Sequence, residues 1–197
     1  ITALRLLAQE LPEAEAGPVL AELFKIEQYV EMALGYLRLE RPATDYVFRT
    51  CDLDALVRQC LRKYARLFIG KRLGVDYEPV ACRVLTDEKW LCFVMEQVLS
   101  NAVKYTHAGG VRIYLARERV LAIADTGIGI AAEDLPRVCE KGFTGYNGRM
   151  DKRATGLGLY LCKAIMAKLG HTLEIESQLG KGTTVYLDLN TLPAVTE

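Results

Sequence analysis

The chain has 197 residues, 51% of them hydrophobic, which is enough for one ordinary domain or for one domain with a small appendage. Lysine plus arginine and aspartate plus glutamate both number 25, so there is no basic excess to favour nucleic acid and no direct role for it is expected. The six cysteines form no CxxC pair and only two histidines exist, which argues against zinc and suits buried thiols in a reducing cytosol.

Residues 1–42 predict a helical hairpin. Residues 1–10 have the pattern of a helix that begins upstream of Ile1, so we expect the chain to be part of a longer protein, and residues 11–18 predict a turn. Residues 19–40 predict a long helix with one apolar stripe, made of Leu20, Leu23, Ile26, Val30, Leu34 and Leu37. Such a stripe needs a partner, as in helical bundles. No segment has the length of a membrane span and no signal peptide is recognisable, so no direct membrane contact is expected.

Residues 45–190 predict an α+β domain in which helices cover one face of a sheet. Helices are expected over 52–69, 86–105 and 157–169. Strands are expected at 46–48, 74–78, 82–86, 171–177 and 182–189, with a two-stranded hairpin at 109–126. Residues 131–155 show little periodicity and contain glycine and proline, so they predict a long loop.

The helix at 86–105 carries two stripes. Its core face is predicted to consist of Leu91, Val94, Met95, Val98, Leu99 and Ala102. Beside that face, Gln97, Asn101 and Lys104 recur at i, i+4 and i+7. An amide oxygen beside an ammonium group suits magnesium with phosphate, because magnesium prefers oxygen ligands and phosphate attracts cations. A solvated helix face fits the same spacing, so both interpretations stay open.

Three glycine-containing segments could bind a ligand. The loop at 131–155 holds Lys141, Arg149, Lys152 and Arg153, which suit a lid over phosphates or a disordered surface loop. Gly156 and Gly158 open a helix whose predicted core face is Leu157, Leu161, Ala164 and Ile165; such helix starts attract phosphate, although packing also explains the glycines. "DTGIGI" at 125–130 follows a buried strand and fits either a turn or a site. P-loop, GxGxxG, HRD and DFG signatures are absent from the sequence.

The segments "EQVLSNAVKYT", "DTGIGI", "EKGFTG", "TGLGLYLCK" and "GKGTT", in this order, resemble the ATP-binding catalytic domain of sensor histidine kinases. They correspond to the N, G1, F, G2 and final GxGT boxes of that family and cover about residues 45–190. The wording "EKGFTG" followed by "NGR" is most similar to the intramembrane-sensing, bacitracin-sensor type. The resemblance implies a two-layer α/β sandwich of the histidine-kinase, gyrase and Hsp90 ATPase type, preceded by a helical hairpin.

The resemblance also implies roles around the nucleotide. Asp125 would accept a hydrogen bond from the adenine amino group, and a buried carboxylate needs such a donor. Asn101 would be the Mg²⁺ ligand, Lys104 a phosphate contact, and Tyr105 a neighbour of the adenosine. Gln97 occupies a position that varies among relatives, so no role is assigned to it.

Further ATP contacts are implied in the glycine-rich segments. Gly127 and Gly129 would let the backbone turn tightly beneath the nucleotide, Phe143 would anchor the lid, and Thr183 would lie near the adenine end. The remaining contacts would come from the lid and the start of the helix after it: Arg153, Gly156, Leu157, Gly158 and Leu159.

These roles imply a protein-histidine kinase that binds Mg-ATP and transfers the γ-phosphate to a histidine, for relay to a response-regulator aspartate. The hairpin resembles the dimerisation and phosphotransfer helices from just after their histidine box. The acceptor is therefore expected upstream of Ile1, and neither His107 nor His171 replaces it. The implied parent is a homodimeric protein of a bacterial cell membrane, with this portion in the cytoplasm.

Three alternatives remain at this stage. An ATPase of the gyrase, Hsp90 or mismatch-repair type would have a glutamate four residues before the magnesium asparagine, where this chain has Gln97; Glu96 lies about 100° round the helix. A nucleotide-binding module without kinase activity would also fit the fold, although the boxes are intact. The serine-kinase anti-sigma class shares the boxes but lacks the hairpin at 1–40.

Overall fold

The computed structural model describes residues 2–40, 46–145 and 155–190, which fall into two compact units divided between Thr44 and Asp45. The first unit is a helical hairpin in which α1 (Thr2–Gln9) contacts α2 (Glu13–Leu39). The predicted turn over residues 11–18 is wrong after Pro12, which is the N-cap of α2, and the helix continues through Pro18. Glutamate and alanine at 13–16 are good helix formers, which explains the early start.

The second unit is built on a five-stranded sheet in the order β2-β4-β5-β7-β6. Only β2 and β4 run parallel; the other neighbours are antiparallel. Side chains in register on one face form much of the core, with Ile113 opposite Ile123, and Leu121 opposite Leu187. The strands are β2 (Gly74–Tyr77), β4 (Gly110–Arg117), β5 (Val120–Asp125), β6 (Thr172–Gln178) and β7 (Gly182–Asp188).

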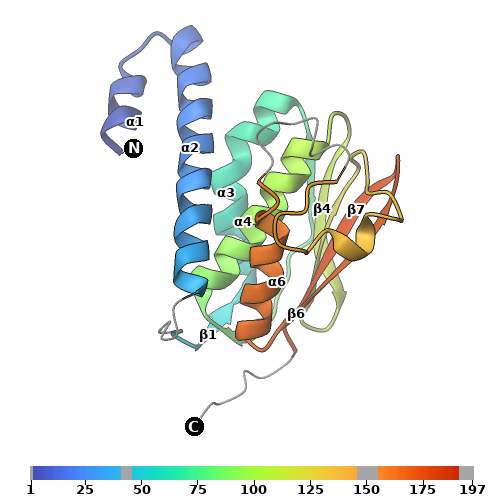
Figure 1. Cartoon of the computed structure of the whole chain (residues 1–197). Coiled ribbons are helices and arrows are strands. Elements are labelled where there is room, and N and C mark those ends of the chain that lie inside the picture. Colours follow the sequence, from blue (N-terminus) through green and yellow to red (C-terminus); the bar gives the residue numbers. More distant parts are fainter. Residues whose placement is uncertain (1, 41–45, 146–154, 191–197) are drawn as a thin grey trace. The chain divides into compact units, whose positions relative to one another are not determined.

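Helices α3 (Leu53–Lys71), α4 (Glu88–Tyr105) and α6 (Gly158–Lys168) cover one face of this sheet, as Figure 1 shows. Every predicted core residue of α4 is buried. The prediction for α6 holds only for Leu161 and Ile165. Leu157 and Ala164 are half-buried, because Leu157 precedes the helix and the buried stripe is completed instead by Cys162 and Met166.

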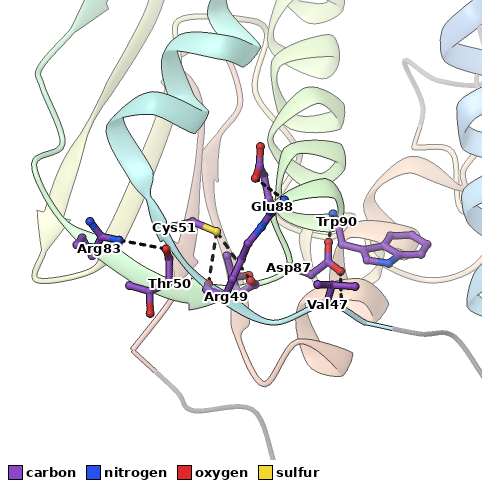
Figure 2. A network of polar contacts seen from close by, with 9 residues as sticks. Val47, Arg49, Thr50, Cys51, Arg83, Asp87, Glu88 and Trp90 are labelled. Carbon is purple, nitrogen blue, oxygen red and sulfur yellow. Dashed lines mark hydrogen bonds and ion pairs between the residues drawn. The ribbon is translucent and has the colours of Figure 1, made fainter.

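A separate two-stranded sheet pairs β1 (Arg49–Asp52) with β3 (Arg83–Thr86) where the chain enters this unit. The predicted strand at 46–48 is wrong, since the strand begins at Arg49. The N–H of Val47 donates to Asp87 Oδ2 at 2.8 Å, and Asp87 Oδ1 accepts from Trp90 N–H at 3.1 Å, capping α4. Figure 2 shows this network, with the Arg49–Glu88 ion pair at 2.8 Å. The entering segment is thus fastened to the start of α4.

The predicted long loop is irregular over 131–145 apart from the short 3-10 turn η1 (Leu135–Arg137). Its positions 146–154, with Arg149, Lys152 and Arg153, lie outside the described residues. All six cysteines are free thiols, four of them buried. None of the described helices combines the length and the apolar character that crossing a bilayer requires.

Candidate functional site

Asp125 lies at the end of β5, where the chain leaves the sheet. Its Oδ1 accepts hydrogen bonds from the backbone N–H groups of Gly127, at 2.8 Å, and Thr183, at 3.3 Å. Burial raises the pKa of this carboxyl group, while the two N–H donors favour its charged form. Because both bonds go to Oδ1, the other carboxylate oxygen, Oδ2, can accept a hydrogen bond from a ligand.

The loop 125–130 leaves no room for a side chain at its glycines. A Cβ atom on Gly127 would lie 2.6 Å from the carbonyl oxygen of Tyr105. Gly129 has φ +69°, and its Cβ atom would lie 2.1 Å from the carbonyl oxygen of Gln178. The N–H of Ile128 donates to the backbone carbonyl of Tyr105 at 3.1 Å. The loop is therefore held between the end of α4 and the turn that joins β6 to β7.

Ser177, near the end of β6, connects this loop with β7. Its hydroxyl oxygen accepts from the N–H of Ile130 at 2.8 Å and donates to the carbonyl of Gly182 at 2.9 Å. It also lies 2.9 Å from the hydroxyl oxygen of Thr183, whose N–H binds Asp125. Sequence analysis missed Ser177, because a single serine in an alternating strand has no distinguishing spacing.

The last turn of α4 is held by groups from outside the helix. Carbonyls at a helix C-terminus have no partner within the helix. Lys71 of α3 donates through Nζ to the carbonyls of Val103, at 2.5 Å, and Lys104, at 3.4 Å, and its positive charge suits this helix end. Desolvation lowers the pKa of Lys71. Asn101 and Lys104 therefore project from a fixed helix end, which sequence analysis did not foresee because the bonded groups are distant backbone atoms.

The polar stripe of α4 is not a uniformly solvated face. Gln97 is only 5% exposed, whereas Asn101 and Lys104 are half-buried. A Cβ atom on Gly158 would lie 3.3 Å from Gln97 Oε1, so the stripe meets the first residue of α6. The ammonium group of Lys104 lies 5.0 Å from the ring centre of Tyr105. The interpretation as a solvated face is thus wrong for Gln97.

The N-terminus of α6 is available to an anion. In the described structure Leu157, at the N-cap, provides no side-chain hydrogen bond to the helix. The unpaired N–H groups of a first turn and the helix dipole attract phosphate. Gly158 and Leu159 form this turn and are half-buried. Gly158 and Leu159 thus stay predicted contacts for phosphate.

The middle of the loop 131–155 returns to the residue that follows the loop, beside this helix start. The N–H of Gly142 donates to the carbonyl of Gly156 at 3.0 Å. Phe143 follows, half-buried, with the guanidinium of Arg137 4.7 Å from its ring centre. Phe143 and Gly156 are thus brought together, whereas Arg153 lies outside the described residues.

Neither histidine takes part in the contacts described above. His171 is 2% exposed, and its Nε2 lies 3.2 Å from Thr86 Oγ1 in β3. His107 is exposed after α4. Among the described residues, no group of three or more histidine, cysteine, aspartate or glutamate side chains is placed to hold a metal ion.

Along α4, one end of the site suits a base and the other an anion. The acceptor loop 125–130 is bonded to Tyr105, and the start of α6 meets Gln97. These positions are eight residues apart on the helix, or about 12 Å at 1.5 Å per residue. A nucleoside triphosphate can bridge such a distance, with Asn101 and Lys104 between its two ends.

Sequence similarity gives the family context. A sequence model of the histidine kinase-, DNA gyrase B- and HSP90-like ATPase family matches residues 86–193. Sensor protein BceS of Halalkalibacterium halodurans is 34% identical over 191 residues, covering 95% of this chain and 57% of that protein. Sensor histidine kinase YxdK of Bacillus subtilis is 34% identical over 193 residues, covering 94% and 59%. The chain spans a little over half the length of these relatives, and they confirm the predicted resemblance to the bacitracin-sensor type.

Solved structures give the fold. Full-length ShkA, in a complex with AMPPNP, matches with a TM-score of 0.72 at 23% identity over 99% of this chain and 42% of that chain. The Acinetobacter baumannii histidine kinase AdeS matches with a TM-score of 0.64 at 23% identity over 95% and 92%. The predicted α/β sandwich is therefore confirmed.

Proposed function

This chain belongs to the histidine kinase-, DNA gyrase B- and HSP90-like ATPase family, and we propose that it contains the ATP-binding catalytic domain of a sensor histidine kinase. The proposed domain, residues 45–190, presents the γ-phosphate of ATP to a histidine upstream of Ile1. In the whole protein, which is proposed to be membrane-anchored with this portion in the cytoplasm, the phosphate then passes to an aspartate of a response regulator. Phosphoryl transfer of this kind depends on positioning and charge neutralisation.

The observation that carries the proposal is the arrangement along α4. At one end, the half-buried carboxylate of Asp125 has Oδ2 left as an acceptor, which suits the amino group of adenine. At the other end, the uncapped start of α6 favours the terminal phosphates. Tyr105, Gly127 and Thr183 lie around the base end by their contacts with this loop.

Asn101 fits a magnesium site between these ends. Magnesium commonly keeps several waters and takes few protein ligands beside substrate phosphates, so one amide oxygen is a sufficient donor set. Asn101 would hold the ion, Lys104 would pair with a phosphate oxygen, and the ion, when bound, would neutralise phosphate charge. Gly156, Leu157, Gly158 and Leu159 would enclose the phosphates, with Phe143 and Arg153 in the lid.

The character of Gln97 favours phosphotransfer over hydrolysis. It is the buried polar side chain of α4 that meets the start of α6. Hydrolysis is accelerated by a group that takes a proton from water, and a neutral amide cannot do so. Glu96 is not in that position, because it forms an ion pair with Lys63 of α3 at 2.5 Å.

The hairpin is proposed to dimerise in the parent protein. Its helices expose many apolar side chains for their size, including Leu4, Leu6, Leu7, Val19, Ile26, Val30, Leu34 and Leu37. Exposed apolar stripes on antiparallel helices are typically covered in a bundle, and a second copy of the hairpin provides a matching stripe.

Labelled phosphate transfer tests the proposed reaction. With γ-labelled ATP, this chain alone should form no phosphohistidine, because His171 is buried and His107 follows Tyr105 at the base end, whereas the γ-phosphate is proposed at the start of α6. With an intact dimerisation hairpin of its parent protein, it should label that hairpin on a base-stable, acid-labile bond. A hairpin with its acceptor histidine replaced by glutamine is the control. Acid-labile label on this chain, retained without His107 and His171, would contradict the assignment.

Asn101→Ala is expected to weaken Mg-ATP binding by about tenfold, because a ligand to the ion is lost, while binding of adenosine without magnesium stays unchanged. Calorimetric titrations with magnesium and with EDTA would measure both effects. Lys89→Ala provides a control on an exposed position of the same helix. Equal losses under both conditions would show that Asn101 supports the base pocket and not the metal.

A further inference from the structure

The hydroxyl of Ser177 has one proton and three hydrogen-bond partners. The carbonyl of Gly182 can only accept, and the N–H of Ile130 can only donate. The single proton of Ser177 is therefore directed to Gly182, at 2.9 Å, and one lone pair is taken by Ile130, at 2.8 Å. In the third contact, to the hydroxyl of Thr183 at 2.9 Å, Ser177 can therefore only accept, through its second lone pair.

This arrangement fixes the direction of the Thr183 hydroxyl. Because Ser177 has no further proton, Thr183 must donate its own proton to Ser177. The Thr183 oxygen then has only lone pairs to offer to any other group. Within the described residues, Ser177 is the only hydrogen-bond partner of this hydroxyl.

The Thr183 oxygen lies beside the carboxylate of Asp125. The two residues are directly opposite each other in the β5–β7 register, so their side chains share one face of the sheet. They are also joined by the bond from Thr183 N–H to Asp125 Oδ1. Both side chains are half-buried. Asp125 Oδ2 and Thr183 Oγ1 therefore offer two acceptors and no donor to a base bound there.

We propose that Ser177 is a positioning residue for base specificity. By holding the Thr183 proton, it makes the base pocket accept an amino group at the purine 6-position and reject a carbonyl group there. The inference rests on the proposed nucleotide site and deepens it, since Ser177 acts through Thr183 and does not touch the base.

A purely structural role for Ser177 predicts a different result. Ser177 also joins the loop 125–130 to β7, so its removal would loosen this loop and weaken the binding of all nucleotides to the same extent. If Ser177 orients the Thr183 hydroxyl, its removal instead changes the ratio of the dissociation constants for two nucleotides that differ at the 6-position. Inosine triphosphate is the suitable probe, because it has the sugar and phosphates of ATP but a carbonyl group at the 6-position.

The experiment measures dissociation constants for Mg-ATP and Mg-inosine triphosphate on the full chain. The wild type should prefer ATP. In Ser177→Ala the freed Thr183 proton can donate to the 6-carbonyl, so the preference for ATP should fall about three- to tenfold, the size of one ordinary hydrogen bond. In Ser177→Ala/Thr183→Val no hydroxyl remains at position 183, and the preference should equal that of Thr183→Val alone, because Ser177 acts only through Thr183. Ser177→Thr keeps a hydroxyl and should keep the preference.

Thr183→Val alone gives a second test that does not need Ser177→Ala to fold. With its proton held by Ser177, the Thr183 hydroxyl can only accept, so its removal should weaken the binding of ATP, which offers a 6-amino donor, more than the binding of inosine triphosphate, whose 6-carbonyl it cannot bind. A larger loss for inosine triphosphate would overturn the inference. An unchanged preference in folded Ser177→Ala, or a preference that Ser177→Ala lowers just as much on the Thr183→Val background, would also overturn it while leaving the proposed ATP site standing. A wild type that binds neither nucleotide would instead overturn the proposed function, and this inference with it.

Discussion

Gly129→Ala is expected to lower the unfolding temperature of the α/β unit by about 10 °C and to remove nucleotide binding. The new Cβ atom would lie 2.1 Å from the carbonyl oxygen and 2.7 Å from the carbonyl carbon of Gln178. Both atoms are backbone at the end of β6, so relief of the overlap requires the loop 125–130 to move away from the sheet. Overpacking and the left-handed backbone together should lower the free energy of unfolding by about 3–5 kcal/mol. Each kcal/mol corresponds to roughly 2–4 °C in the unfolding temperature of a domain of this size.

Gly180→Ala separates these two causes. Gly180 lies in the turn between β6 and β7 and has φ +78°, close to the +69° of Gly129, but nothing lies within 4 Å of its Cβ position. This variant should be destabilised only by the left-handed backbone conformation that its alanine must adopt. The expected cost is roughly 1 kcal/mol, or a few degrees in the unfolding temperature. Thermal unfolding followed by circular dichroism compares the two. Equal shifts would mean that the contact between Gly129 and Gln178 has no role in stability.

Periodicity was sufficient to predict most elements of this unit. The helix at 86–105 has six apolar positions at helical spacing, and all six are buried in α4. The errors lie where a tertiary contact decides. Residues 46–48 have strand-like side chains, yet Val47 gives its N–H to the carboxylate of Asp87 instead of a neighbouring strand. Likewise, the proline-containing segment at 11–18 looks like a turn, but its alanines and glutamates extend α2.

The candidate site was predictable where glycines and charges recur in a recognisable order. Asp125, Gly127 and Gly129 are placed in a tight loop, as the segment "DTGIGI" suggested. Ser177 and Lys71 were not predictable, because their partners are backbone groups and a hydroxyl far away in the sequence. Helical spacing put Gln97 on a polar stripe, but it could not reveal that α6 covers this end of the stripe.

Asp125→Asn is expected to lower ATP affinity by more than tenfold and to shift the preference from ATP toward inosine triphosphate. The N–H groups of Gly127 and Thr183 both point at the Oδ1 position. An asparagine must place its amide oxygen there, because its NH₂ group would face two donors. The NH₂ group then occupies the Oδ2 position and meets the adenine amino group donor to donor. Loss of the charge-assisted bond alone costs on the order of 1.5–3 kcal/mol, or about tenfold or more.

The same variant should remove a pH dependence of base binding. Burial raises the pKa of Asp125, so its protonation on acidification begins at a higher pH than for an exposed aspartate. A protonated Asp125 is a weaker acceptor, and wild-type affinity for adenosine should therefore fall as the pH drops through this raised pKa.

The free energy of unfolding should change in the opposite direction. A pKa that is higher in the native state than in the unfolded state means that the native state binds this proton more tightly, so protonation of Asp125 stabilises the fold. Titrations with adenosine, which has no phosphates to titrate, should show the decline in the wild type and a flat profile in Asp125→Asn, with no loss of stability in the unliganded variant. Parallel profiles would assign the pH dependence to another group and would remove Asp125 from the base pocket.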